Sequence, residues 1–530
     1  MPPARPRPPL DQAIRDPGFT PRARDLDGLV DLLAEDVQTR HAERALTRLG
    51  GAAFDGLRTR FQGAGPPLRA RVLRVIGRLT DEPRARTLLV AALDDADPKT
   101  RRNAAIALGH TRAEGVEEAL LAAWERDPRP EMRRTVAASL GKVGGPRSLP
   151  VLRAAASAHD AELARIATRA TMMVERTGSR ADRGRIVPDR APVKPVGVTL
   201  LARRGLEELL ADELRSVAAV TDVRVAGPGR VGARLAGSMS ALFAARTMLS
   251  FRFPLPTESP REGETVQDAI AWAAASDAAR AVFDTWTEGA VRYRIAWAEG
   301  GHRRAATWGA AAAIARRQPE LVNDPTGSLW ELVVAGDEGL VDVSLAPRAV
   351  VDPRFAWRRG DVPAASHPTI AAALARVAGV RADDVVWDPF VGSGAELVER
   401  GRLGPYRSLR GSDLEPRALT VARENLTAAG LAADLELADA LALAPAAVTL
   451  VITNPPMGRR ASRTATLADT LDRFVAHAAA VLVPGGRLVW IAPWPQRARD
   501  AAARAGLTLA WSRLIDMGGF DAEMQRWIRS

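Results

Sequence analysis

Cysteine is absent from this 530-residue sequence. Without a thiol the chain cannot form a disulfide framework, a thiolate zinc site or a cysteine nucleophile, so these three classes of site are excluded together. Long apolar runs are also missing, since no segment reaches the roughly 18 apolar residues of a membrane span. Residues 1–9 are rich in proline and arginine and lack an apolar segment behind them, so we expect no secretory signal, no membrane contact and a cytoplasmic location.

Lysine is nearly absent, and arginine carries most of the positive charge. The formal net charge is +11, and it is unevenly distributed along the chain. Residues 1–190 contain 34 lysine and arginine residues against 25 aspartate and glutamate residues, whereas the remainder is close to balance. A local basic surplus favours contact with a polyanion such as a nucleic acid. A general preference of the source organism for arginine is the alternative explanation.

An internal repeat follows residues 1–25, which we interpret as a flexible arm. Four series keep one period of 32 residues, namely Gly77, Gly109 and Gly141; Pro66, Pro98 and Pro130; Leu88, Leu120 and Leu152; and Arg69, Arg101, Arg133 and Arg165. Each unit predicts two helices, because the proline suits a first helical turn and the glycine follows the last one. Helix pairs of this kind bury their apolar faces by stacking on their neighbours, which predicts a solenoid.

The repeats resemble HEAT repeats over residues 26–178, with Asp97, Pro98 and Arg101 in the expected places. The resemblance implies an all-α solenoid that binds nucleic acid or a protein partner. We expect the four repeated arginines to brace the turns between repeats. A row of phosphate contacts is the alternative.

Residues 179–195 are polar and contain proline, and we interpret them as a linker. Residues 196–345 alternate strand patterns with helix patterns and predict a compact α+β module. The expected strands and helices cover residues 198–201, 205–214, 223–225, 231–235, 291–297, 305–316, 329–334 and 340–345.

The string from Arg204 to Leu210 resembles the opening of the THUMP-containing RNA methyltransferases. The resemblance implies a ferredoxin-like subdomain and a THUMP fold that together grip structured RNA. Its candidate RNA contacts are Arg303, Arg304, Arg316 and Arg317, unless these arginines form a solvated helix face.

Residues 346–530 have the pattern of an α/β Rossmann-like domain. The apolar strand 385–387 runs into a glycine-rich turn, Asp388-Pro389-Phe390-Val391-Gly392-Ser393-Gly394, and then into a helix. Such a turn brings backbone N–H groups close to a ligand without obstruction by Cβ atoms. Later strands end at Asp413, Asp439 and Asn454. Strand ends of a doubly wound sheet converge on one edge, where ligands bind.

The string Asn454-Pro455-Pro456-Met457 indicates a reaction at an exocyclic amine of a nucleic-acid base. An exocyclic base amine is a weak nucleophile, because its lone pair is delocalised into the ring. Hydrogen bonds from the amine to the Asn454 side-chain carbonyl and the Pro455 main-chain carbonyl would align that lone pair, and the prolines would hold the loop rigid. Catalysis would then rest on positioning and electrostatics, with no metal and no covalent intermediate. The target base must also leave its stack.

This set resembles the class I amino-methyltransferases, and specifically the THUMP-linked RNA guanine-N2 methyltransferases. The resemblance implies S-adenosyl-L-methionine as the cofactor, tRNA or rRNA as the partner, and methyl transfer to guanine N2. It implies a catalytic role for the loop Asn454, Pro455, Pro456 and Met457. The cofactor-binding residues that we predict are Asp388, Pro389, Phe390, Gly392, Gly394, Asp413, Leu414, Asp439, Ala440 and Thr369, the last from the segment Ser366–Thr369, which would close over the cofactor.

Met457 departs from the family, in which an aromatic residue usually stacks on the flipped base. Adenine N6 methylation of RNA or DNA therefore stays open, because that amine fits the same two acceptors. A third interpretation is a HEAT scaffold that binds RNA or protein and carries a degenerate methyltransferase domain. Beyond Met457, the arginines Arg459, Arg460 and Arg463 could contact phosphates or belong to a solvated loop.

Overall fold

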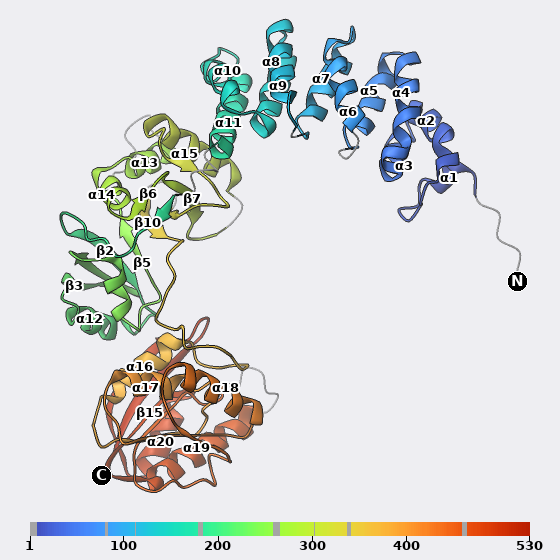
Figure 1. The fold of residues 1–530 in the computed structure, drawn as a ribbon. Helices are drawn as coiled ribbons and strands as arrows, with labels where there is room; N and C mark the ends of the chain where they lie inside the picture. Colours follow the sequence, from blue (N-terminus) through green and yellow to red (C-terminus); the bar gives the residue numbers. More distant parts are fainter. Residues whose placement is uncertain are drawn as a thin grey trace, which may run out of the picture.

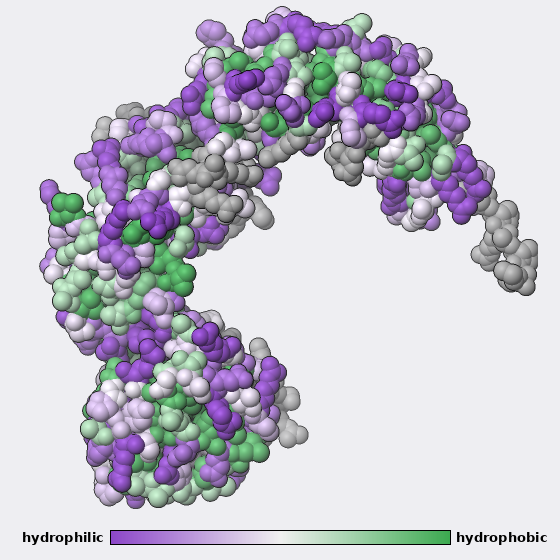
Figure 2. Space-filling view, viewed as in Figure 1, coloured by the Kyte–Doolittle hydropathy of each residue, from purple (hydrophilic) through white to green (hydrophobic). Residues whose placement is uncertain are grey.

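Three parts follow one another along an open arc, with a helical array at one end and the C-terminal domain at the other (Figure 1). The computed structural model describes residues 8–79, 83–111, 113–178, 184–257, 265–300, 303–336, 341–457 and 464–530. Hydrophilic side chains cover much of the visible face of the array, and apolar side chains show between its helices (Figure 2). In these ranges, no helix combines the length and apolar character that crossing a bilayer requires.

The array consists of stacked helices, as the 32-residue repeat predicts. Its helices are α1 (Leu10–Ala13), α2 (Leu26–Ala34), α3 (Thr39–Leu49), α4 (Phe54–Gly63), α5 (Pro66–Ile76), α6 (Pro83–Ala91), α7 (Pro98–Leu108), α8 (Val116–Arg126), α9 (Pro130–Val143), α10 (Leu149–Ala155) and α11 (Ala161–Gly178). Helices α5, α7, α9 and α11 pack in succession, and their apolar residues form one continuous core.

The repeated glycines allow these helices to approach closely. A Cβ atom on Gly77 would lie 2.5 Å from Cβ of Ala107 in the next repeat, and one on Gly141 would lie 2.8 Å from Cβ of Ala170. Helices α5 and α7 end at Ile76 and Leu108, so Gly77 and Gly109 follow the last helical turn as predicted, whereas α9 continues past Gly141 to Val143. The missing side chain of these glycines is also needed for packing between repeats.

Two of the repeated arginines, Arg69 and Arg101, brace the turns between repeats, as predicted. Arg69 forms an ion pair with Asp95, and Arg101 Nε lies 3.1 Å from Asp127 Oδ2. The Arg133 guanidinium lies 5.2 Å from the centre of the Trp124 ring. These contacts within the array engage the same arginine side chains that the alternative prediction assigned to phosphate groups of a nucleic acid.

The structure corrects two boundaries. Residues 8–25 are part of the array, because Ile14 and Phe19 are buried in its core and their carbonyl oxygens accept hydrogen bonds from Arg44 and Arg48. The prediction of a flexible arm is therefore wrong for residues 8–25. Within the predicted linker 179–195, strand β1 (Arg185–Ile186) pairs with β6 (Thr287–Glu288). The second half of the predicted linker therefore belongs to the middle module.

The middle module contains an eight-stranded sheet with the order β3-β4-β2-β5-β10-β9-β7-β8. Pairing of β5 with β10 joins the two halves of this sheet. The first half, β3-β4-β2-β5, resembles the expected ferredoxin-like unit, and the second half is β10-β9-β7-β8. Its elements are β2 (Val196–Leu201), α12 (Glu207–Arg215), β3 (Val220–Gly227), β4 (Arg230–Leu235), β5 (Ser250–Pro254), α13 (Val266–Ala274), α14 (Asp277–Trp286), β7 (Arg292–Trp297), α15 (Arg304–Arg317), β8 (Val322–Asn323), β9 (Trp330–Ala335) and β10 (Asp342–Pro347).

The C-terminal domain is a Rossmann-like α/β domain, as predicted. Its elements are α16 (Pro368–Ala378), β11 (Val385–Asp388), α17 (Ala395–Leu403), β12 (Ser408–Asp413), α18 (Pro416–Ala428), β13 (Asp434–Leu437), β14 (Val448–Thr453), α19 (Thr464–Val481), β15 (Leu482–Ala492), α20 (Pro495–Arg504), β16 (Leu507–Asp516) and β17 (Asp521–Arg529). The sheet order is β13-β12-β11-β14-β15-β17-β16, in which β17 runs antiparallel to both neighbours. The chain leaves β11 to one side and returns to the other at β14, so the point where ligands bind in such sheets lies between these strands.

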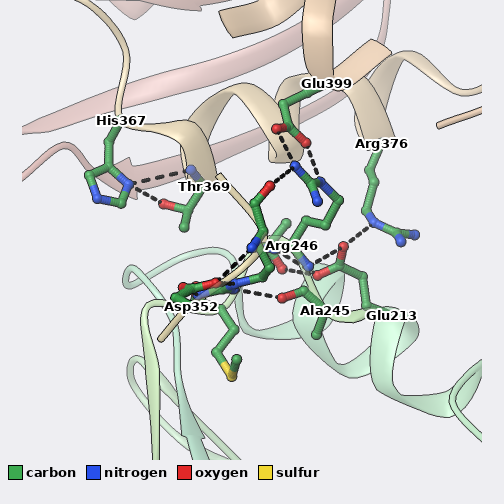
Figure 3. Close-up of polar contacts among 11 residues, drawn as sticks. Glu213, Ala245, Arg246, Asp352, His367, Thr369, Arg376 and Glu399 are labelled. Carbon is green, nitrogen blue, oxygen red and sulfur yellow. Dashed lines mark hydrogen bonds and ion pairs between the residues drawn. The ribbon is translucent and has the colours of Figure 1, made fainter. Parts of the chain in front are cut away.

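Charged side chains fasten the middle module to the C-terminal domain (Figure 3). Arg246 Nη2 donates to Glu399 Oε1 of α17 at 2.6 Å, and Arg376 of α16 forms an ion pair with the buried Glu213 of α12. Gly205 lies so close to β16 that a Cβ on it would collide with the Leu514 carbonyl oxygen. At the other junction, α11 packs on α15, where Arg169 lies 4.6 Å from the centre of the Trp308 ring.

Candidate active site

Asp388 ends β11 with its side chain fully buried. Its Oδ1 accepts hydrogen bonds from the Phe390 N–H at 3.1 Å and the Thr453 hydroxyl at 2.7 Å, whereas Oδ2 has no partner among the described residues. Burial, reinforced by the nearby carboxyl of Glu396, raises the pKa of Asp388 well above its ordinary value. An unpaired buried carboxylate oxygen is costly in an isolated protein, so it suits a cationic ligand group.

The glycine-rich turn adopts the open conformation that the sequence predicts. Gly392 and Gly394 have φ values of +48° and +78°, which side chains rarely allow. The Gly392 N–H donates to Asp413 Oδ2 at 3.0 Å, so the turn and the end of β12 are brought together. Ser393 Oγ is buried, and no hydrogen-bond partner for it lies in the described ranges.

The ends of β12 and β13 present carboxylates beside exposed apolar side chains. The Ala438 N–H donates to the Asp413 carbonyl oxygen at 3.2 Å, which joins the two strand ends. Leu414 is 67% exposed and Leu437 is 57% exposed, so both offer apolar surface suited to an adenine ring. Leu437 was not among the predicted residues, although an apolar residue at the carboxyl end of a strand is a signal that could have indicated it.

Asp439 is exposed, its Oδ1 accepts the Leu441 N–H at 2.9 Å, and Ala440 beside it is buried. Pro389 is buried, and the half-buried Phe390 ring packs edge-on against Phe474 with 5.1 Å between centres.

Thr369, the remaining predicted cofactor residue, is fully buried at the start of α16. Its hydroxyl lies 2.8 Å from Nδ1 of His367, so it already has a protein partner (Figure 3). Burial, together with nearby Arg203 and Arg358, lowers the pKa of His367 to about 4. The imidazole is therefore neutral near pH 7, and its Nδ1 can accept the hydrogen bond.

Asn454 follows β14 and points its amide into the same region. Its Nδ2 donates to Ser366 Oγ at 2.8 Å, while its Oδ1 is buried and lacks a hydrogen-bond partner in the part of the chain that the structure describes. Pro455 is buried, Pro456 is exposed, and Met457 is half-buried against the core. The predicted phosphate contacts Arg459, Arg460 and Arg463 lie outside the described residues.

Three buried oxygens without described partners therefore surround the carboxyl ends of β11 and β14. They are Asp388 Oδ2, Ser393 Oγ and Asn454 Oδ1. With the open turn and the apolar surface of Leu414 and Leu437, they fit S-adenosylmethionine, which has a cationic methionyl end and an adenosine. The acceptor oxygen of Asn454 remains for a hydrogen-bond donor of the substrate.

Comparison with known proteins agrees with this geometry. The family described as an RMKL-like methyltransferase domain matches residues 356–513, and HEAT repeats match residues 54–124 and 85–172. The chain is 31% identical over 344 residues to the tRNA (guanine(6)-N2)-methyltransferase of Thermus thermophilus, covering 59% of this chain and 94% of the relative. It is 33% identical over 135 residues to the tRNA (guanine(10)-N2)-dimethyltransferase of Methanothermobacter thermautotrophicus, covering 25% and 39% of the two chains.

A solved structure resembles nearly two thirds of this chain. The crystal structure of TrmN from Thermus thermophilus aligns with a TM-score of 0.50 and 25% identity, covering 63% of this chain and 99% of that one. The protein is thus an enzyme with S-adenosylmethionine as its cofactor. The chain belongs to the family of THUMP-linked RNA guanine-N2 methyltransferases, to which it adds an array of HEAT repeats.

Proposed function

We propose that this protein transfers a methyl group from S-adenosylmethionine to the exocyclic N2 of a guanine in tRNA. The observation that carries the proposal is the unpaired, buried Oδ1 of Asn454 beside Asp388, at the point of the sheet where ligands bind. The names of the relatives from Thermus and Methanothermobacter, which both act on guanine N2 of tRNA, favour this base and this RNA.

The residues of the site act by binding and orientation. Bound S-adenosylmethionine supplies an electrophilic methyl group on its sulfonium. Asp388 Oδ2 would hold the cationic methionyl end, and the carboxylates of Asp413 and Asp439 would accept hydrogen bonds from the ribose and adenine. Asn454 Oδ1 and the Pro455 carbonyl would accept the N–H groups of the guanine amine and so orient its lone pair for methyl transfer. Asn454 is a neutral amide, so the proton released from the methylated nitrogen passes to solvent.

The RNA would be held by the middle module and by the basic helical array. Three of the four candidate contacts are already engaged within the module. Arg303 lies 5.0 Å from the Trp297 ring centre, Arg317 lies 3.8 Å from that of Trp272, and Arg316 Nη2 lies 3.9 Å from Asp268 Oδ1. Stacked arginines still expose donors to phosphate, so these side chains stay candidates for RNA contact. A protein partner of the array is a further proposal that its HEAT repeats support.

The proposal is tested with Asn454→Ala. We expect methyl transfer to tRNA to fall by about 10²–10³-fold, because one fixed acceptor at the reacting amine is lost. The dissociation constant for S-adenosylmethionine, measured by calorimetry, should change less than about twofold, since Asn454 contacts the substrate side of the site. Asp413→Ala is the matched variant on the cofactor side and should weaken cofactor binding instead.

Nucleoside mass spectrometry of tRNA and rRNA from cells with and without the protein identifies the product. Loss of N2-methylguanosine from tRNA is the expected result. A product that is N6-methyladenosine, or an Asn454→Ala protein as active as the wild type, would overturn the proposal.

A further inference from the structure

A chain of buried hydrogen bonds links Asn454 to the start of α17, two residues beyond Gly394 of the glycine-rich turn. The Asn454 Nδ2 donates to Ser366 Oγ at 2.8 Å, and the Ser366 hydroxyl donates in turn to Oε1 of Glu396. Ser366 is 7% exposed and Glu396 is 4% exposed. The three residues come from the end of β14, the segment before α16, and the first turn of α17, and 88 residues separate Asn454 from Ser366.

The direction of these hydrogen bonds decides which end of the Asn454 amide faces the substrate. A carboxamide has a donor end and an acceptor end of almost the same shape, whereas a serine hydroxyl has one proton to donate. Because Ser366 gives that proton to Glu396, its oxygen faces Asn454 only as an acceptor. The NH₂ end of Asn454 must therefore turn toward Ser366, which leaves Oδ1 at the cleft.

The reversed amide would be unfavourable at both ends. Oδ1 would face a hydroxyl oxygen that has no proton to offer, and the NH₂ group would face the N–H groups of the target amine. Two donors opposed in a buried site leave each other unsatisfied.

The other charged groups around Glu396 are Asp388, Glu399 and Arg358, and burial raises the pKa of Glu396. Either protonation state of Glu396 leaves Oε1 able to accept from Ser366, provided that any proton resides on Oε2.

We propose that Ser366 and Glu396 are positioning residues that hold the Asn454 amide with its carbonyl oxygen toward the exocyclic amine. This inference rests on the proposed function, because it gives Asn454 the role described there. It assigns two residues a role that they exert through Asn454, and it explains why a buried glutamate lies two residues into α17 beside Asp388.

A double-mutant cycle tests the proposal with the full chain and tRNA. Ser366→Ala should lower the single-turnover rate of methyl transfer by about 10-fold or more, while the dissociation constants for S-adenosylmethionine and tRNA change less than about twofold. In the Asn454→Ala background the same substitution should cost less than about twofold, because a residue that acts only through Asn454 has nothing left to orient. Equal losses in both backgrounds, or no loss in the wild type, would overturn the proposal.

The outcome also separates this inference from the proposed function. If Asn454→Ala retains the wild-type rate, the proposed function fails. If Asn454→Ala loses activity but Ser366→Ala does not, only the positioning role fails.

Conservative variants provide a second comparison that does not depend on Ser366→Ala folding. Glu396→Gln keeps an acceptor oxygen for the Ser366 hydroxyl and should retain the rate within about threefold, whereas Glu396→Ala should share the loss seen for Ser366→Ala. Ser366→Thr keeps the hydroxyl and should behave like Glu396→Gln. A Glu396→Gln protein as slow as Glu396→Ala, with unchanged thermal stability and cofactor binding, would contradict the proposal.

Discussion

Asp384 precedes β11 at the opposite end of this strand from the active site, and it has no exposed surface. Arg400 Nη2 donates to its Oδ2 at 2.7 Å, Arg487 forms a second ion pair with it, and the Thr449 hydroxyl donates to its Oδ1 at 2.9 Å. Burial opposes ionisation, but the hydrogen bonds from Arg487 and Arg400 hold the pKa of Asp384 below its ordinary value. The carboxylate of Asp384 is therefore shared between two buried arginines.

Removing the shared carboxylate should leave two buried guanidinium groups without their counter-charge. We expect Asp384→Asn to lower the free energy of unfolding of the C-terminal domain by about 3–5 kcal/mol, measured by urea denaturation. Asp383→Asn, at the exposed neighbouring position, is the control and should change it by less than about 0.5 kcal/mol. Because the pKa of Asp384 is lowered by folding, its stabilising contribution is present above the ordinary carboxyl range and is lost as the pH falls through the folded value. Equal effects of the two variants would contradict this account.

The raised pKa of Asp388 predicts a pH dependence of cofactor binding. A cationic ligand favours the carboxylate, so the dissociation constant for S-adenosylmethionine should rise as the pH falls, beginning at a higher pH than for an ordinary aspartate. Calorimetry in buffers of different ionisation enthalpy should show proton release on binding. Asp388→Asn should bind more weakly and lose most of this dependence. A flat profile in the wild type would show that Asp388 does not face the cation.

At the scale of elements, local patterns predicted most of what surrounds the site. The ends of β11, β12 and β14 were placed correctly, because β11 and β14 are apolar runs that precede a turn and β12 ends at an acid just before a helix that starts with proline. The pairing of β1 with β6 was not predicted, since a two-residue strand has no periodicity. The contacts of Ser366 and Glu396 were also missed, because they depend on how α16, α17 and β14 pack, and no spacing along the chain encodes that packing.

The contact of Gly205 with β16 predicts how the middle module is held on the C-terminal domain. Its φ is +93°, and an added Cβ would collide with the Leu514 carbonyl oxygen. Gly205→Ala should therefore lower the melting temperature and raise the KM for tRNA, since the module would shift on the catalytic domain. Gly227→Ala is the matched control, because φ is +132° there but a Cβ would meet no atom of the described residues within 4 Å.

We expect Gly227→Ala to cost only the backbone strain, about 1–3 kcal/mol, and Gly205→Ala to cost clearly more. Differential scanning fluorimetry and tRNA titrations measure both effects. If the two variants shift the melting temperature and the KM equally, the close approach to β16 has no influence on docking.

At the scale of the whole molecule, the basic surplus of residues 1–190 predicts that the array strengthens RNA binding. A chain of residues 184–530 should keep the single-turnover rate at saturating tRNA but bind tRNA more weakly. Its affinity should also depend less on salt, because the slope of log K against log salt concentration shrinks by about 1 for each phosphate that is no longer neutralised. Filter binding at several salt concentrations measures this. An unchanged slope and affinity would instead favour a protein partner for the array.

The helix α11 is shared between two parts of the molecule, because it packs on α9 of the array and on α15 of the middle module. Its 18 residues form one continuous rod, so the array cannot swing without breaking one of these two contacts. The arc of Figure 1 then keeps the array at a set distance from the active site. We expect an RNA that contacts both ends of the arc to present only the nucleotide at the matching distance, so that the fold of the RNA rather than the neighbouring sequence would select the target.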